Sequence, residues 1–265
     1  MRAVFAAGVL DHFLEQHFNP FDFYLGVSAG ASNIAGYLAD MPGRTLKVYT
    51  DYCIQPQFID FKRFAKGGHL MDLDWLWQVT IADIRLNLER IHQRNPFYVV
   101  TTNVAAGCAE YHQTATETLE DLMLASSSMP LFYRDFPVID GAPRTDGGIA
   151  DALPVAEAIR RGATDIMVIR SRPRSYIKKK DWSSRPVAWK LRRYPQLKPL
   201  LLSRTERYNR SLDLLRSPPP GVRILEICPP ENFSPSRLGR EREVLLHGYE
   251  QGRTAGIEAL ADWLR

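Results

Sequence analysis

A serine set between two glycines, Gly26-Val27-Ser28-Ala29-Gly30, is the segment whose spacing best suits covalent catalysis. At a tight turn from a strand into a helix such a serine points outward. Both glycines are expected to be required, because a side chain there would meet the neighbouring strand and helix. The helix N-terminus would favour negative charge beside Ser28, and the Ala29 amide would donate to an oxyanion. The pattern predicts Ser28 as a nucleophile.

A serine nucleophile needs a base, and the sequence offers two kinds. The α/β-hydrolases use a late histidine, and of the six histidines only His247 follows the third expected strand. His247 lies in a charged stretch typical of an exposed helix, and the 27 residues before Ser28 hold too few strands for that fold. The other candidate is Asp146. Asp146-Gly147-Gly148 is often only a turn, but a carboxylate at a neighbouring strand end would reach the serine.

These residues need strands and helices to position them. Apolar runs predict strands at 21–27, 97–101, 165–170 and 222–227, and a strand-like run at 136–139 approaches Asp146. Helices are expected at 4–17, 28–38, 154–162 and 240–264, and a further one through 122–124 after a capping box at Thr114 and Glu117. Because the strands are apolar throughout, they indicate a parallel sheet with helices on both faces, an α/β fold.

The composition excludes several classes of protein. With 45% apolar and 24% charged residues, the chain is neither disordered nor fibrous. No apolar run approaches the roughly 18 to 20 residues that a membrane-spanning helix needs. Cys53, Cys108 and Cys228 are too few and too scattered for a disulfide framework or a zinc site. We therefore expect a cytoplasmic protein that uses no metal or other cofactor.

Positive charge is concentrated in one stretch. Residues 170–216 hold 15 Lys and Arg against 3 acids, a net charge of +12 in a chain whose total is +4. Such a stretch attracts phospholipid headgroups or nucleic acid, and Trp182 and Trp189 suit a membrane interface. We favour peripheral contact with an anionic membrane, at its inner face, over nucleic-acid binding. A solvated segment without function is the remaining alternative.

Taken together, the motifs resemble those of the patatin-like phospholipases, most closely the bacterial single-domain branch. In that family the serine of G-x-S-x-G and the aspartate of D-G-[GA] form a dyad without histidine, which corresponds here to Ser28 and Asp146. The similarity is clearest in the runs 2–11, 125–130 and 146–170, and it extends over essentially the whole chain. It implies a three-layer α/β/α sandwich with a mostly parallel central sheet, and metal-independent hydrolysis of acyl esters in lipids.

One part of the family pattern is missing. The family's oxyanion loop reads G-G-G-x-[RK]-G after a core strand, and this sequence begins at the x with Met1, followed by Arg2 and Ala3. The resemblance therefore implies a single domain over 1–265 that lacks the first strand and the glycine loop. In this domain Arg2 would support the oxyanion site, and 170–220 would be a basic insertion. Either the natural start lies ~10 to 40 residues upstream, or the protein is truncated and weakly active.

Two functions are compatible with these features. The leading one is a serine lipid acyl hydrolase of the phospholipase A or esterase type, in which Ser28 attacks the ester, Asp146 takes its proton and Ala29 holds the oxyanion. The alternative is a catalytically weak or inactive lipid-binding or regulatory module that docks on anionic membranes. The headgroup, the acyl position and the oligomeric state stay open.

Overall fold

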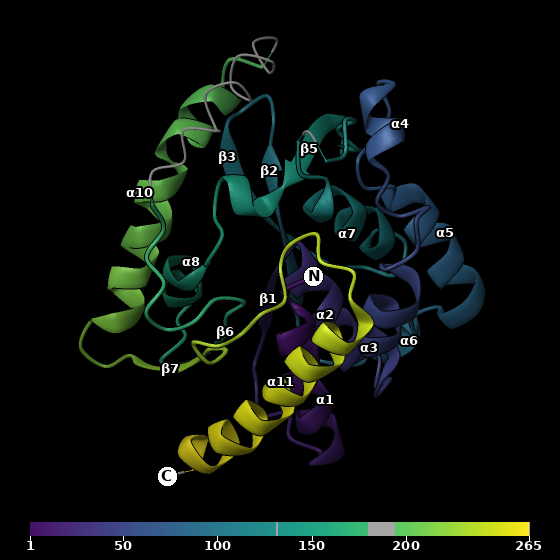
Figure 1. Cartoon of the computed structure of the whole chain (residues 1–265). Coiled ribbons are helices and arrows are strands. Elements are labelled where there is room, and N and C mark those ends of the chain that lie inside the picture. The colour runs from purple at the N-terminus through teal and green to yellow at the C-terminus, as the bar shows by residue number, and fades with distance from the viewer. Residues whose placement is uncertain (131, 180–193, 265) are drawn as a thin grey trace.

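Helices and strands alternate along the chain, as expected for an α/β fold, in a computed structural model that describes residues 1–130, 132–179 and 194–264 (Figure 1). The helices are α1 Val4–Glu15, α2 Ala29–Leu38, α3 Arg44–Lys47, α4 Phe61–Ala65, α5 Leu73–Ile84, α6 Leu88–His92, α7 Leu119–Ser127, α8 Val155–Arg160, α10 Leu197–Arg216 and α11 Arg242–Trp263, with the short π and 3₁₀ helices η1 Val48–Tyr52 and η2 Gly147–Ile149. The strands are β1 Tyr24–Val27, β2 Phe97–Asn103, β3 Cys108–Gln113, β4 Val138–Ile139, β5 Ala142–Asp146, β6 Asp165–Ile169 and β7 Arg223–Ile227.

The described strands form two sheets. One has the order β1-β2-β5-β4, with β3 paired to β2, and the other consists of β6 and β7. The pairs β1–β2 and β6–β7 are parallel, as expected, whereas the pairings of β3, β4 and β5 are antiparallel. Strand β3 was not predicted from the sequence, because it is polar and partly exposed and carries no apolar run. The α/β class of the fold is confirmed.

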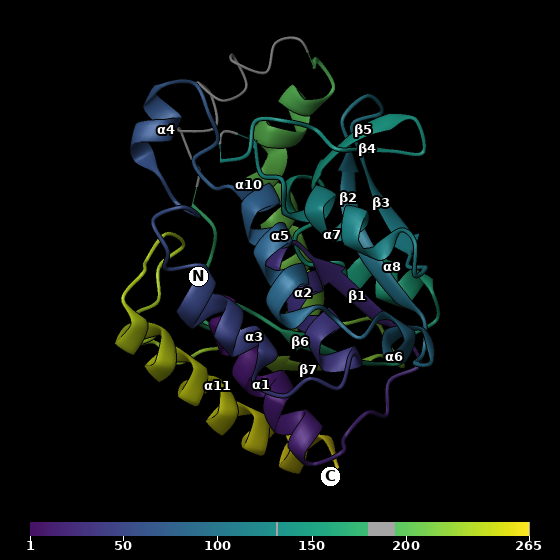
Figure 2. The ribbon, with the colours of Figure 1, turned by 90° about the vertical axis from the view of Figure 1, so that its right-hand side faces the viewer.

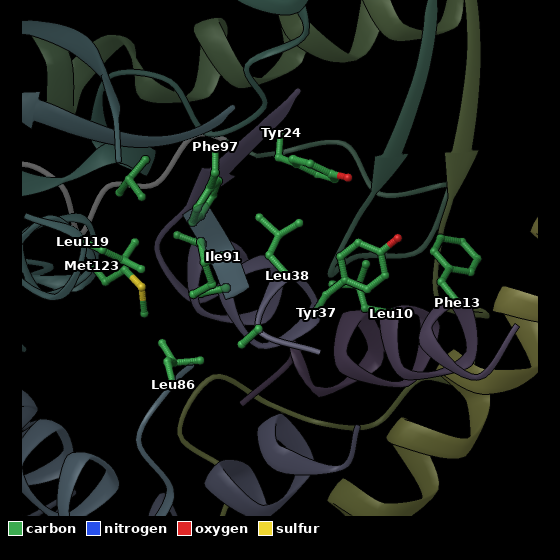
Figure 3. Close-up of a cluster of buried hydrophobic side chains, with 14 of the residues drawn as sticks. Leu10, Phe13, Tyr24, Tyr37, Leu38, Leu86, Ile91, Phe97, Leu119 and Met123 are labelled. Atoms are coloured by element: carbon green, nitrogen blue, oxygen red, sulfur yellow. The ribbon is translucent and has the colours of Figure 1, made fainter. Parts of the chain in front are cut away.

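Helices cover the first sheet on both faces. The side chains of β1 alternate between two apolar clusters, since successive residues of a strand point to opposite faces. Tyr24 packs with Leu38 of α2 and Phe97 of β2 in the main core, as Figure 3 shows. Leu25 instead packs into a cluster that contains Val155 of α8 and Leu215 of α10. The result is the layered α/β/α arrangement that the resemblance implied.

Helices α1 and α11 lie side by side although they come from opposite ends of the chain (Figure 2). Their backbones approach so closely that a Cβ atom on Gly8 would lie 2.1 Å from the Tyr249 carbonyl oxygen, and one on Gly252 would lie 2.0 Å from that of Phe5. Residues Val4 to Phe13 are all buried or nearly so. The helix expected over 4–17 is observed as Val4–Glu15, and it is a core helix because α11 covers its second side.

The basic stretch is partly built into the fold. Helix α10 buries Leu197, Leu201, Leu212 and Leu215, and it contacts α8, η2 and β7. This helix is a layer over the sheet. Lys180, Trp182 and Trp189, which the membrane hypothesis uses, lie outside the described residues.

Helix α7 does not begin at the expected capping box. Its N-cap is Thr118, and the helix starts at Leu119, so the expected start at Thr114 and Glu117 is wrong. The Thr118 hydroxyl bonds to the carbonyl of Ala115 in the preceding turn, and no side chain caps the helix. A local sequence pattern was overridden here by the turn that leads the chain out of β3.

Candidate active site

The turn between β1 and α2 holds Ser28 in an unusual backbone conformation. Its φ is 54° and its ψ is −128°, a region that residues with a side chain rarely adopt. Gly26 is sterically required, because a Cβ atom there would lie 2.6 Å from the Cα of Ala31. Gly30 is different: a Cβ atom on it would meet nothing within 4 Å. The expectation that both glycines avoid a clash is therefore wrong for Gly30, which lines an open cavity.

Asp146 ends strand β5 and faces the serine across a junction of strands. Val27 of β1 lies beside Val100 of β2, and Asp146 lies beside Thr101. Because β3 pairs along the opposite edge of β2, β1 and β5 share one edge and meet end to end. The Ser28 hydroxyl donates a hydrogen bond of 2.8 Å to Asp146 Oδ2. The carboxylate comes from β5, and not directly from the strand-like run 136–139, which forms β4 in part.

The Asp146 carboxylate is buried and held at both oxygens. The residue is only 3% exposed, and its Oδ1 accepts a hydrogen bond of 2.8 Å from the Gly148 amide. Gly147 allows the tight turn, since a Cβ atom there would lie 2.2 Å from the Val100 carbonyl oxygen. Burial raises the pKa of Asp146 above its ordinary value, although the charge of Arg204 and the hydrogen bond from Ser28 oppose this shift. A raised pKa makes this carboxylate a better proton acceptor than an exposed one.

Ser126 fixes the backbone of the serine turn. Its hydroxyl accepts a hydrogen bond of 2.8 Å from the Ser28 amide and donates one of 2.6 Å to the Val100 carbonyl. The sequence analysis noted the run 125–130 without a role for any of its serines. Ser127 lines the cavity, whereas Ser128 is buried and bonded to the carbonyl of Ala125.

The oxyanion candidates lie at the same cavity wall. Ala29 opens α2, so its amide belongs to the first helical turn, where no intrahelical acceptor is available. Arg2 also lines the cavity. Burial, with the nearby charges of Arg172 and Arg237, lowers the pKa of Arg2 to about 10.

A cavity of about 810 Å³ opens at Ser28 and Asp146. Its wall includes the apolar side chains of Leu124, Met129 and Phe132. It extends between β1 and β6, whose facing edges have no described strand between them. Such a volume with an apolar wall suits a small organic or acyl substrate.

Three arginines from the C-terminal part of the chain surround the turn at Asp146, and the sequence analysis assigned none of them. Arg204 of α10 donates to the Gly148 carbonyl at 2.9 Å, and Arg207 donates to the Ala150 carbonyl at 3.0 Å. Arg237 lines the cavity with Arg204. The sequence signal for these arginines was the high charge of the residues that form α10, and that signal does not indicate which arginines face the cavity. His247 is exposed on α11 and does not line the cavity.

Two further searches covered the described ranges only. Within residues 1–130, 132–179 and 194–264, no group of three or more His, Cys, Asp and Glu is arranged to hold a metal ion. In the same ranges no helix has both the length and the apolar character to cross a membrane.

Comparison with known proteins agrees with this arrangement. The profile of the patatin-like phospholipase family matches residues 1–159, which include Ser28 and Asp146. A second profile, a domain of unknown function named DUF6363, matches residues 194–265, which include Arg204 and Arg237. The chain is also 36% identical over 267 residues to the uncharacterized protein YjjU of Escherichia coli K12, an alignment that covers 98% of this chain and 74% of the relative. The chain therefore belongs to the patatin-like phospholipase family.

Proposed function

We propose that the protein is a serine lipid acyl hydrolase that works through a Ser28–Asp146 dyad. The observation that carries the proposal is the 2.8 Å hydrogen bond from the Ser28 hydroxyl to Asp146, two residues 118 positions apart in the chain. The positive φ of Ser28 and the burial of Asp146 support it, because both features cost stability and such features cluster at functional sites.

The geometry supports a two-step mechanism. Asp146 takes the hydroxyl proton while Ser28 Oγ attacks the ester carbonyl, and the Ala29 amide donates to the developing oxyanion. The tetrahedral intermediate then collapses, the alcohol leaves with the proton from Asp146, and an acyl group stays on Ser28. Asp146 next takes a proton from water, the hydroxide attacks the acyl-enzyme, and the free acid leaves as the proton returns to Ser28.

Two features favour a lipid ester as the substrate. The wall of the cavity that holds Ser28 includes the apolar side chains of Leu124, Met129 and Phe132, which suits an acyl chain. The matched family profile is that of phospholipases. The acyl position and the chain length are outside this proposal.

The test combines turnover with covalent labelling. The purified protein should hydrolyse p-nitrophenyl butyrate and should react with a fluorophosphonate probe at Ser28, identified by peptide mass spectrometry. A protein that neither turns over the ester nor binds the probe would contradict the proposal and leave the lipid-binding module as the better explanation.

We further propose that the enzyme docks on anionic membranes through the segment around Ile177 and helix α10. Ile177 is 57% exposed and Leu202 is 48% exposed, and both belong to the basic stretch. The segment is held against the helix by hydrogen bonds between Asn209 and the backbone of Lys178. Exposed apolar side chains among basic ones suit a membrane interface. Sedimentation with phosphatidylglycerol vesicles, compared with phosphatidylcholine vesicles, tests this part.

A further inference from the structure

Arginine side chains gather at the catalytic end of the cavity. Arg2, Arg204 and Arg237 line the same cavity as Ser28 and Asp146. Two of the three lie in the region 194–265 that matches DUF6363. The patatin-matched part of the chain therefore holds the dyad, and the C-terminal region adds most of the positive charge.

Arg204 is placed directly beside the carboxylate. A Cβ atom on Gly148 would lie 3.0 Å from Asp146 Oδ1 and 3.7 Å from an Arg204 Nη atom, so the guanidinium and the carboxylate border the same small space. Arg204 uses its Nε to bind the Gly148 carbonyl. Among the described residues its terminal nitrogens have no assigned hydrogen-bond acceptor, and they border the cavity.

Arg2 and Arg237 form no close ion pair in the part of the chain that the structure describes, although the charge of Asp146 acts on Arg237. Arg237 lies over the ring of Phe132 at 5.7 Å, and neither guanidinium forms an ion pair with a described carboxylate. Burial lowers the pKa of Arg237, and the neighbouring positive charge of Arg204 adds to this effect. Among the described residues that line this end of the cavity, Asp146 supplies the negative charge, and its Oδ2 already accepts a hydrogen bond from the Ser28 hydroxyl. The cluster therefore carries excess positive charge that an anion would balance.

We propose that Arg2, Arg204 and Arg237 form a subsite for the phosphate of a phospholipid whose ester lies at Ser28. Guanidinium groups bind phosphate oxygens in pairs, whereas a neutral ester offers them no charge to bind. The proposal rests on the proposed hydrolase function for the ester, and it gives the C-terminal region a role in choosing the substrate. The competing explanation is that the arginines act only through Asp146, by keeping its carboxylate ionised.

The first experiment compares two soluble esters, so that vesicle binding does not enter. The measured quantity is the ratio of two kcat/KM values, that for dihexanoyl phosphatidylglycerol below its micellar concentration divided by that for p-nitrophenyl butyrate. Arg237→Gln should lower this ratio about 10- to 100-fold, which is the size of a lost charge-assisted hydrogen bond. Arg237→Lys keeps the charge and loses the paired geometry, so its ratio should lie between that of the wild type and that of Arg237→Gln. Arg242→Gln is the matched control, because Arg242 is exposed at the start of α11 and away from the cavity. An unchanged ratio for Arg237→Gln would overturn the subsite.

The second experiment measures the phosphate group without turnover. Calorimetric titration of the Ser28→Ala protein with sn-glycero-3-phosphoglycerol should show binding. The double variant Ser28→Ala, Arg237→Gln should bind this headgroup at least about tenfold more weakly. Tight binding of inorganic phosphate that the headgroup cannot displace would overturn the lipid source of the phosphate. If the wild type shows neither turnover nor probe labelling, the proposed hydrolase function fails, and Arg237-dependent headgroup binding would still support the phosphate subsite.

Discussion

The proposed Ser28–Asp146 dyad and the arginine cluster border one cavity, but the chain positions them in different ways. Ser28 and Asp146 are placed by backbone: two strand ends meet on one edge of β2, and Gly26 and Gly147 permit contacts that a side chain would forbid. Arg204 and its neighbours reach the cavity with long side chains from α10 and from the segment before α11. Bond-making chemistry demands positions accurate to a fraction of an ångström, whereas charge acts over several ångströms, so flexible side chains suffice for it.

The largest expected effect comes from the nucleophile. Ser28→Ala should abolish labelling by a fluorophosphonate probe and change the melting temperature little, because the substitution removes one hydrogen bond to Asp146 at the cavity and no packing. Labelling on a gel and thermal unfolding measure the two quantities. If the variant still labels, the nucleophile lies elsewhere, and Ser127, which lines the cavity, is the next serine to replace.

The second largest effect is expected from replacing the base. Asp146→Asn should lower kcat for p-nitrophenyl butyrate by at least ~10³, while His247→Ala changes it by less than ~3-fold. Steady-state kinetics at one pH measure both. A large loss of kcat from His247→Ala would replace the dyad by a triad. It would also contradict the contrast drawn above, because a long-range side chain from α11 would then take part in catalysis.

The pH dependence of the wild type gives a separate check on the burial of Asp146. Because burial raises the pKa of this carboxyl, the protonated, inactive form persists to higher pH than for an exposed aspartate. The log of kcat/KM should therefore fall on the acid side with a midpoint above ~4, the ordinary carboxyl value. A midpoint at or below that value would mean that the arginine charges outweigh burial.

The lysines at positions 178–180 of the basic stretch should affect membrane binding and not the chemistry. Replacing Lys178, Lys179 and Lys180 by Glu should weaken binding to phosphatidylglycerol vesicles by more than about tenfold in low salt, since each basic residue near such a surface contributes up to ~1 kcal/mol. High salt should erase most of the difference between the variant and the wild type. Weak binding of both proteins that salt does not change would remove the membrane role.

The smallest effects should separate the two glycines of the serine turn. Gly26→Ala should lower the free energy of unfolding by about 1–3 kcal/mol, because its Cβ atom would overlap Ala31. Gly30→Ala should change it by no more than about 0.5 kcal/mol, because its Cβ atom would point into open space. Urea unfolding measures both. Equal losses would mean that the turn needs both glycines, as the sequence pattern first indicated.

Much of the fold was predictable from local patterns. The run before Ser28 and the run from Phe97 were recognised as strands, and the long C-terminal helix was recognised as well. Strand β3 was missed, since its residues are polar and its partner β2 supplies the pairing. The N-terminal helix was predicted too, but nothing in its own residues shows that α11 will cover its second side.

The sequence by itself predicted Ser28 and Asp146 as the dyad, because a serine turn and an aspartate turn depend on steric rules that act within a few residues and place glycines at fixed positions beside them. Only the tertiary structure decided that β1 and β5 meet on one edge of β2, that Gly30 is open to the cavity, and that three arginines border the same space. These features depend on distances between segments more than 50 residues apart, as in the Arg204–Gly148 contact, and burial and charge are set by such distances and not by residue order.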